Sequence, residues 1–114
     1  MTFVNIIGRV HSFEKRISDN GVEYTDLRLS VMRPYKNYDG YYETDYFKIN
    51  LFDHHHKKAQ SYFHKGMGIA IKGRLEVHKW KDENEEQRHT VDIVVERLIF
   101  LPKDVDSNQL EPEI

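Results

Sequence analysis

The sequence predicts an all-β domain of five strands, with one short helix between the third and fourth strands. Five segments alternate apolar and polar residues with the period of two that is typical of β-strands. Only residues 54–64 place apolar side chains at helical spacing instead. Polar stretches at Asn20-Gly21 and at residues 82–86 supply hairpin turns between strands that follow one another along the chain.

The first two strands are predicted over residues 2–10 and 22–33. Their inner faces hold Val4, Ile6, Gly8, Val10, Leu27, Leu29 and Val31. The outer face of the first strand is also apolar at Phe3 and Ile7, so we expect both of its faces to be partly buried. Asn20-Gly21 favours a two-residue turn because both residues tolerate positive φ. Pro34 then ends the regular pairing, since proline has no backbone N–H.

Residues 35–42 are predicted to form the tip of a protruding hairpin. The segment contains one lysine and four tyrosines: Lys36, Tyr35, Tyr38, Tyr41 and Tyr42. Exposed rings beside a cation suit stacking on nucleic-acid bases. A tip that binds another protein would have the same composition, so both interpretations stay open.

The third strand is predicted over residues 44–52. Its inner residues are Phe47, Ile49 and Leu51, and its outer residues are Tyr46, Lys48, Asn50 and Phe52. Aromatic rings and a cation therefore share the outer face. Asp53 is predicted to cap the following helix, and Lys65-Gly66 to end it. The packed face of this helix is expected to hold Ala59, Tyr62 and Phe63.

The longest alternating stretch, residues 65–80, predicts the fourth strand. Its inner face holds Ile69, Ile71, Gly73, Leu75 and Val77, and its outer face holds Lys72, Arg74, Glu76, His78 and Trp80. The only tryptophan thus shares a face with two cations, a combination that offers base stacking and phosphate contacts together. A tryptophan that covers a hydrophobic gap or a subunit contact is the alternative. The fifth strand is predicted over residues 88–100, with inner residues Val91, Ile93 and Val95.

Five strands with one helix after the third are the layout of the OB fold, a Greek-key barrel whose open face binds oligonucleotides. We expect this domain over residues 1–102, and a short, acidic, flexible tail over residues 103–114. The tail has one lysine against four carboxylates, so the net charge of −2 for the chain becomes +1 for residues 1–102. Nucleic-acid binding therefore depends on where the cations lie rather than on the total charge.

Composition excludes several other classes of protein. The chain has no cysteine, which excludes disulfides and thiolate metal sites and is compatible with a reducing compartment. No apolar run reaches the ~20 residues that span a bilayer, and the chain does not start like a secretion signal. We therefore expect a cytoplasmic protein that is neither embedded in a membrane nor exported.

The histidines are the one group that suggests a metal site or an enzyme. His54, His55, His56 and His64 could offer imidazole ligands to zinc or nickel. However, three adjacent helical residues point in three directions, and no carboxylate lies at ligand spacing with them. Nor does the chain have a Ser/His/Asp arrangement or a phosphate-binding glycine loop. We expect no metal, no cofactor and no catalysis, and interpret the histidines as a solvated first helical turn.

Short motifs occur along the chain in the order and at the spacing of one known family. They are Asn5-Ile6-Ile7-Gly8-Arg9-Val10, Asp45-Tyr46-Phe47-Lys48-Ile49-Asn50-Leu51-Phe52, Ala59 with Ser61-Tyr62-Phe63-His64-Lys65-Gly66, Lys72-Gly73-Arg74-Leu75 with Trp80, Val94-Val95, and Phe100-Leu101. Together they resemble the bacterial-type single-stranded DNA-binding proteins over roughly residues 3–101. The resemblance implies sequence-independent binding of single-stranded DNA in replication, recombination or repair, at a bacterial nucleoid or as a phage or mobile-element protein.

The resemblance also implies which residues contact DNA. In that family the DNA wraps over outward aromatic rings, and the matching positions are Tyr35, Tyr46, Phe52 and Trp80. Two positions that are commonly tryptophan in the family are tyrosine here, which keeps stacking with a smaller ring. Phosphate contacts are expected from cations along the strands: Arg9, Arg28, Arg33, Lys48, Lys72, Arg74 and Lys79.

Partners are implied in the same way. Family members recruit replication and repair enzymes through a long linker and an acidic tip that ends in proline and phenylalanine. Residues 110–114 here supply only acids, one proline and a terminal isoleucine, so the chain resembles short, accessory forms. Apolar residues on outer strand faces predict a homo-oligomer, and the resemblance implies a tetramer. These residues are Phe3, Ile7, Val94, Leu98 and Phe100.

Two other functions stay open. A dimeric, primosome-type OB-fold adaptor of replication restart has a similar size and opening strand but generally lacks the stacking rings. An OB-fold module that binds only protein would use the tyrosine-rich tip.

Overall fold

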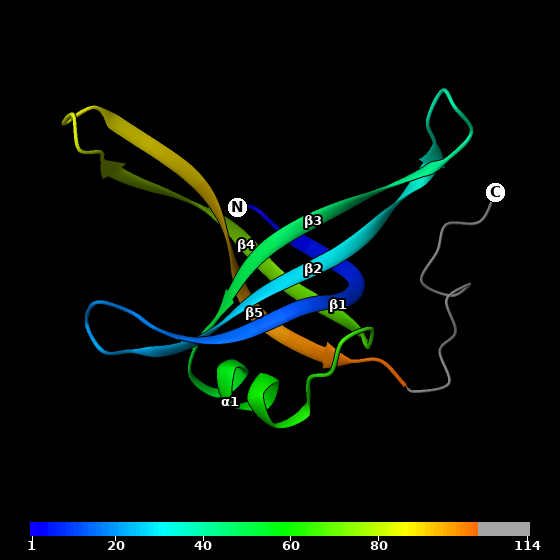
Figure 1. The fold of residues 1–114 in the computed structure, drawn as a ribbon, viewed down its shortest axis with the longest axis horizontal. Coiled ribbons are helices and arrows are strands. Elements are labelled where there is room, and N and C mark those ends of the chain that lie inside the picture. Colours follow the sequence, from blue (N-terminus) through cyan, green and yellow to red (C-terminus); the bar gives the residue numbers. More distant parts are fainter. Residues whose placement is uncertain (103–114) are drawn as a thin grey trace.

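Five strands and one helix make up residues 1–102, the part of the chain that this computed structural model describes. They are β1 (Val4–Ile17), β2 (Glu23–Lys36), β3 (Tyr42–Leu51), α1 (Asp53–Tyr62), β4 (Gly68–Lys81) and β5 (Gln87–Phe100). The strands form one antiparallel sheet in the order β3-β2-β1-β4-β5 (Figure 1). This confirms the prediction of five strands with one helix after the third. The predicted tail, residues 103–114, lies outside the described residues.

The sheet curls because β1 pairs with different strands along its two halves. From Val4 to Arg9 it pairs with β4, and from Arg9 onward it pairs with β2. A β-bulge at His11 interrupts the second pairing between Val10 and Ser12, and such bulges bend a strand. The edge strands β3 and β5 come into contact without forming a ladder in the described part of the chain. The barrel therefore stays open between β3 and β5.

The core lies inside the curled sheet, and α1 covers one side of it (Figure 1). Its buried apolar residues are Ile6, Val10, Leu27, Leu29, Ile49, Leu51, Ala59, Phe63, Ile69, Ile71 and Leu98. These positions confirm the predicted inner faces of the first three strands. Gly8 and Gly73 allow neighbouring strands to approach closely, because a Cβ atom would collide with the carbonyl oxygen of Ser30 or Val94, respectively. No helix within residues 1–102 is long and apolar enough to cross a membrane.

Three hairpin loops share one five-residue geometry, at residues 18–22, 37–41 and 82–86. In each, the N–H of the first residue donates to the carbonyl of the fifth, and the N–H of the fourth donates to the carbonyl of the first. The fourth residue has positive φ: 80° at Gly21, 84° at Gly40 and 59° at Glu85. Asn20-Gly21 does mark a turn, but the predicted two-residue turn is wrong, because Gly21 fills the positive-φ position of a longer loop.

The first turn of α1 differs from its predicted form. Phe52 occupies the N-cap position without a side-chain hydrogen bond, and Asp53 is the first helical residue, with a φ of 53°. The prediction that Asp53 caps the helix is wrong, because the chain turns sharply from β3 into α1 at this residue. His55 and His56 are buried rather than solvated, since this turn packs against the barrel. His56 Nδ1 lies 2.8 Å from Oγ1 of Thr25 in β2.

The β4–β5 hairpin continues past the barrel as a two-stranded extension (Figure 1). Leu75, Val77 and Val91, predicted to face inward, are 40%, 56% and 60% exposed. They share the inner face with Ile71, but the core ends before the hairpin does. Tyr62, predicted on the packed face of the helix, is also exposed.

A second bulge, in β5, changes which residues of this strand face the core from those predicted. Lys72 pairs with Arg97 but Gly73 pairs with Val95, so Glu96 is an extra residue in β5. The extra residue reverses the alternation beyond it. Two residues predicted on the outer face therefore lie in or against the core: Leu98 and Phe100.

Candidate nucleic-acid interface

Two aromatic rings with a cation between them lie on the outer face of β3 and at its end. Tyr46 is 60% exposed and Phe52 is 43% exposed, and Lys48 lies exposed between them. Their side chains point outward because the intervening residues of β3 face the core: Phe47, Ile49 and Leu51. This confirms the outward orientation predicted for these three side chains.

Each of the two rings has an aromatic neighbour on an adjacent strand. The imidazole of His11 in β1 meets Tyr46 edge-on at 4.9 Å between ring centroids. Tyr24 of β2 stacks on Phe52 at 5.3 Å, with an interplanar angle of 29°. Such contacts restrict ring motion and enlarge the aromatic surface. Sequence reasoning missed both neighbours: the outward alternation of β2 could have indicated Tyr24, whereas His11 lies in a bulge that leaves no sequence signal.

Trp80 lies near the end of β4, where it is 43% exposed and paired with Arg88 of β5. Lys72 and Arg74 share its strand face, because β4 alternates without interruption from these residues to Trp80. Lys79 has the opposite parity and lies on the other face. Of the three cations predicted in β4, Lys72 and Arg74 therefore lie on the same strand face as Trp80, and Lys79 does not.

Two hairpin extensions, both pointing away from α1, carry the remaining predicted rings (Figure 1). Residues 33–45 are called the tyrosine arm, and residues 74–94 the tryptophan arm. The tyrosine arm confirms the predicted protruding tip, with Tyr35, Tyr38 and Tyr41 exposed on it. The arms diverge from each other, so a ligand that touches both must cross the barrel surface between them.

Five of the predicted cations make no ion pair with a described residue: Arg9, Arg28, Lys48, Lys72 and Lys79. Arg28 of β2 lies directly opposite Lys48 of β3 in the backbone register, so two positive charges lie side by side on the outer face. Arg9 donates from Nη1 to the carbonyl oxygen of Gly66 at 2.9 Å. These groups have capacity for additional acceptors such as phosphate oxygens.

Two other predicted cations are already bound by carboxylates. Arg33 contacts Asp45 and Glu43, and Arg74 contacts Glu76 and Glu96. The hydrogen bonds that Arg33 donates to Asp45 raise the pKa of Arg33, and those that Arg74 donates to Glu96 and Glu76 raise the pKa of Arg74. A phosphate would have to displace these carboxylates.

The open side of the barrel forms a groove of about 860 Å³ between β3 and β5. Lys48 and Phe52 line it from the β3 side, His54 and His55 from α1, and residues 90–96 from β5. Burial, helped by the nearby His54, lowers the pKa of His55 and favours its neutral form. An extended chain in this groove would touch both the outer face of β3 and the base of the tryptophan arm.

The helical histidines do not converge on a common point. Within residues 1–102, no group of three or more His, Cys, Asp or Glu side chains is arranged to hold a metal ion. His56 shares a hydrogen bond with the hydroxyl of Thr25. The same hydroxyl accepts a hydrogen bond from Nε2 of Gln60 at 3.0 Å. This histidine therefore joins α1 to the barrel.

Sequence comparison places the chain among proteins of one kind. The model of the single-strand binding protein family matches residues 1–101. A single-stranded DNA-binding protein of Thermosynechococcus vestitus is 31% identical over 112 residues, which cover 95% of this chain and 90% of that protein. Single-stranded DNA-binding protein 1 of Staphylococcus aureus is 27% identical over 106 residues, which cover 91% of this chain and 68% of the relative.

Solved structures share the fold. A deletion mutant of the single-stranded DNA binding protein from Thermus aquaticus superimposes with a TM-score of 0.71 at 21% identity, covering 91% of this chain and 52% of that one. A Plasmodium falciparum protein in complex with single-stranded DNA gives 0.68 at 22% identity, covering 90% and 96%. These likenesses confirm the predicted OB fold.

Proposed function

This chain belongs to the single-strand binding protein family, and we propose that it binds single-stranded DNA without sequence preference. It acts in DNA replication, recombination or repair by binding alone, without a catalytic step. The observation that carries the proposal is the pair of exposed rings, Tyr46 and Phe52, that flank Lys48 on one outer surface. Tyr35 and Trp80 extend this aromatic surface onto the two arms.

The spacing of the rings suits an extended strand. Tyr46 and Phe52 are six positions apart, or about 20 Å along a β-strand, so they would stack on different bases. Every base has a flat π-face, which makes stacking tolerant of sequence and worth about 1–3 kcal/mol for each ring.

Phosphate contacts would come first from the cations without carboxylate partners in the described residues. Arg28 and Lys48 lie beside the β3 rings, and Lys72 lies on the Trp80 face of β4. Each phosphate contact on a single strand adds about 0.7 to the slope of log affinity against log salt. Because residues 1–102 carry a net charge of only +1, we expect a negative but moderate slope.

Titration with oligo-dT tests the proposal, with Trp80, the only tryptophan, as the fluorescent probe. Tyr46→Ala and Phe52→Ala should each weaken binding by about 1–3 kcal/mol. Tyr62→Ala is the matched control, because Tyr62 is 64% exposed, close to the 60% of Tyr46, but lies on α1, away from the arms. Equal losses in all three variants, or no binding by the unaltered chain, would overturn the proposal. The latter result would favour a module that binds only protein.

A homotetramer is proposed from an apolar outer surface of β1, β4 and β5. Ile7 pairs with Ala70, and Ala70 pairs with Ile99, so the three lie in one row across these strands. Ile7 and Ile99 are exposed, as is Phe3 just before β1, so residues 1–102 leave this outer surface uncovered. A second subunit would cover it.

Light scattering measures the assembly. The tetramer predicts four times the chain mass of 13.7 kDa. Twice that mass would instead favour the dimeric, primosome-type adaptor, and a single chain mass would refute any oligomer. The variant Ile7→Lys should dissociate the tetramer, because it puts a charge into the covered row.

Recruitment of replication or repair proteins is assigned to residues 103–114, which lie outside the described residues. A chain that ends at Pro102 is expected to keep its affinity for oligo-dT and to lose those partners. Loss of DNA binding on this truncation would contradict the proposed division into a domain and a tail. The bacterial cytoplasm, at the nucleoid, is the location where this function is expected.

A further inference from the structure

The backbone ladder is interrupted at the base of the tyrosine arm. Met32 pairs with Thr44 and Lys36 pairs with Tyr42, so residues 33–35 of β2 lie opposite the single residue Glu43 of β3. Pro34 lies within this stretch and has no N–H to donate. Main-chain hydrogen bonds therefore give little support where the arm leaves the barrel.

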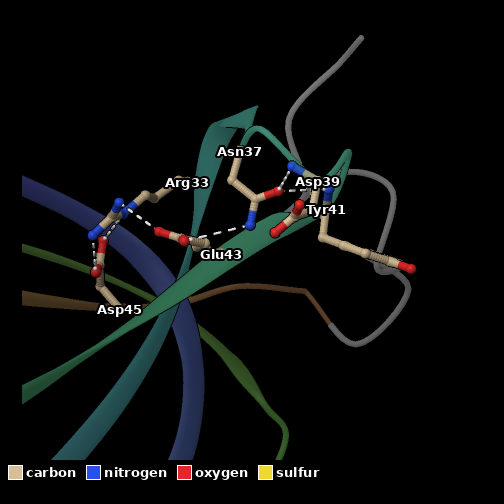
Figure 2. A network of polar contacts seen from close by, with 6 residues as sticks. All are labelled: Arg33, Asn37, Asp39, Tyr41, Glu43 and Asp45. Atoms are coloured by element: carbon tan, nitrogen blue, oxygen red, sulfur yellow. Dashed lines mark hydrogen bonds and ion pairs between the residues drawn. The ribbon is translucent and has the colours of Figure 1, made fainter.

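Arg33 joins the two strands at this interruption (Figure 2). Its Nε and Nη2 donate to the two carboxylate oxygens of Asp45, each at 3.0 Å, and its Nη1 donates to Glu43 at 2.7 Å. This bidentate contact fixes the orientation of the guanidinium group as well as its position. Side-chain bonds here replace the missing ladder.

The network continues from Arg33 to the turn. Nδ2 of Asn37 donates to the second carboxylate oxygen of Glu43 at 3.4 Å. Oδ1 of Asn37 accepts hydrogen bonds from the backbone N–H groups of Asp39 and Tyr41, each at 3.0 Å. Figure 2 shows this chain of contacts running from the base of the arm to the turn.

The charges in the network weaken the case for Arg33 as a phosphate ligand. One guanidinium faces two carboxylates, so Arg33, Glu43 and Asp45 together carry a net charge of −1. Three tyrosines stand exposed on the same arm: Tyr35, Tyr38 and Tyr41. A ring held in place before binding loses less conformational freedom when it stacks on a base.

We infer that Arg33 is a positioning residue: with Glu43, Asp45 and Asn37 it holds the tyrosine arm in the conformation that presents its rings to single-stranded DNA. This replaces the phosphate contact predicted for Arg33 from the sequence. The inference rests on the proposed function for its ligand, but the ordering of the arm is a property of the free protein.

Removing a carboxylate separates positioning from simple electrostatics. Asp45→Asn deletes a negative charge near the DNA, which by electrostatics alone would tighten binding. Positioning predicts the reverse, a loss of about threefold to tenfold in affinity for oligo-dT. Asp39→Asn is the matched control, because it removes the same charge from the same arm while only the backbone N–H of Asp39 takes part in the network. It should bind as tightly as the unaltered chain or slightly more tightly.

Two further measurements complete the test. Arg33→Gln should weaken binding without changing the salt slope, whereas loss of a phosphate contact would lower the slope by about 0.7. Hydrogen exchange of the Asp39 and Tyr41 amides in the free protein should speed up in Arg33→Gln and Asp45→Asn. The exchanged pair, Arg33→Asp with Asp45→Arg, should restore both affinity and slow exchange.

Tighter binding by Asp45→Asn, a flattened salt slope in Arg33→Gln, or unchanged exchange in both variants would overturn the inference. If the unaltered chain does not bind oligo-dT, the proposed function fails. Hydrogen exchange then still decides whether Arg33 orders the arm.

Discussion

The tyrosine arm and the tryptophan arm end in the same turn but present different chemistry. In residues 37–41 and 82–86 the backbone hydrogen bonds are the same. In both, the side-chain oxygen of the first residue, Asn37 or Asp82, accepts from the N–H groups two and four positions later. Turn geometry therefore depends on the first residue and on the positive-φ position, and the other side chains are left for function.

The difference lies in those other side chains. The tip of the tyrosine arm carries exposed Tyr38 and Tyr41, whereas the tip of the tryptophan arm is acidic at Asp82, Glu83 and residues 85–86. Acidic groups repel phosphate. DNA contacts on the tryptophan arm should therefore stop at Trp80. On the tyrosine arm, they can extend to the tip of the hairpin.

The arms also differ in what supports them. The tryptophan arm has an unbroken ladder from Gly73 to Lys81, and Arg88 adds ion pairs to Asp82 and Glu86 at its tip. The tyrosine arm lacks ladder bonds at its base and relies on Arg33. We therefore expect side-chain substitutions to disorder the tyrosine arm more readily than the tryptophan arm.

The largest effect is expected from Trp80→Ala. Losing this ring should weaken oligo-dT binding by about 1–3 kcal/mol, because residues 74–94 contain no other Trp, Tyr or Phe ring. Tyr35→Ala should cost less, since other exposed tyrosines share its arm. The affinity is measured by the anisotropy of labelled oligo-dT, as the fluorescent probe is lost. A properly folded Trp80→Ala chain with unchanged affinity would contradict the comparison.

The second-largest effect is expected from substitutions at the positive-φ residue of each turn, which should change the stability of the two arms in opposite directions. Gly40→Ala should lower the free energy of local opening of the tyrosine arm by about 1 kcal/mol, because Gly40 has a φ of 84°. Glu85→Gly should change the tryptophan arm in the opposite direction and by less, since relief of strain is partly offset by the greater freedom of glycine when unfolded. Native-state hydrogen exchange measures both. Equal signs for the two variants would refute the shared turn geometry.

Acid should disorder the tyrosine arm first. A hydrogen bond from Arg33 lowers the pKa of Asp45, and one from Arg88 lowers the pKa of Asp82. Each pair stabilises its arm fully above the ordinary carboxyl pKa of 3.8, and the contribution is lost as the pH falls through the lowered folded value. Amide NMR shifts recorded between about pH 5 and pH 2 should therefore change earlier in the arm that has no continuous ladder. Simultaneous changes in both arms would show that the ladder makes no difference.

The smallest effect is expected from the acidic tip. Glu83→Gln should tighten oligo-dT binding by about twofold at low ionic strength, and the gain should vanish at high salt. Asp19→Asn is the control, because Asp19 is exposed at the same position of the third hairpin loop, residues 18–22. Equal gains in both variants would mean that only the total charge matters.

Strand alternation was enough to predict the fold and the outward rings. Leu27, Ile49 and Ile69 are fully or almost fully buried, and Tyr46 is exposed, as a period of two requires. The same pattern failed where geometry departs from it. Alternation does not show where a barrel ends and an arm begins, so Val77 was predicted to be buried.

Other errors came from contacts that need a known register. The bulge at Glu96 moved Leu98 into the core, and a bulge leaves little trace in one sequence. His55 and His56 were predicted to be solvated because histidine is polar, yet the barrel covers them. The pairing of Arg33 with Asp45 depends on how β2 and β3 align, which the sequence alone does not fix.

The proposed function requires that the exposed rings beside Lys48 hold the bases of single-stranded DNA. Photocrosslinking to oligonucleotides that contain 5-iodouracil, followed by mass spectrometry of the peptides, tests it most directly, because stacked rings form adducts with this base. We expect adducts at Tyr46, Phe52 and Trp80 and none at Tyr62 on α1. Adducts confined to the α1 side of the barrel, with none on the β3 rings, would contradict it.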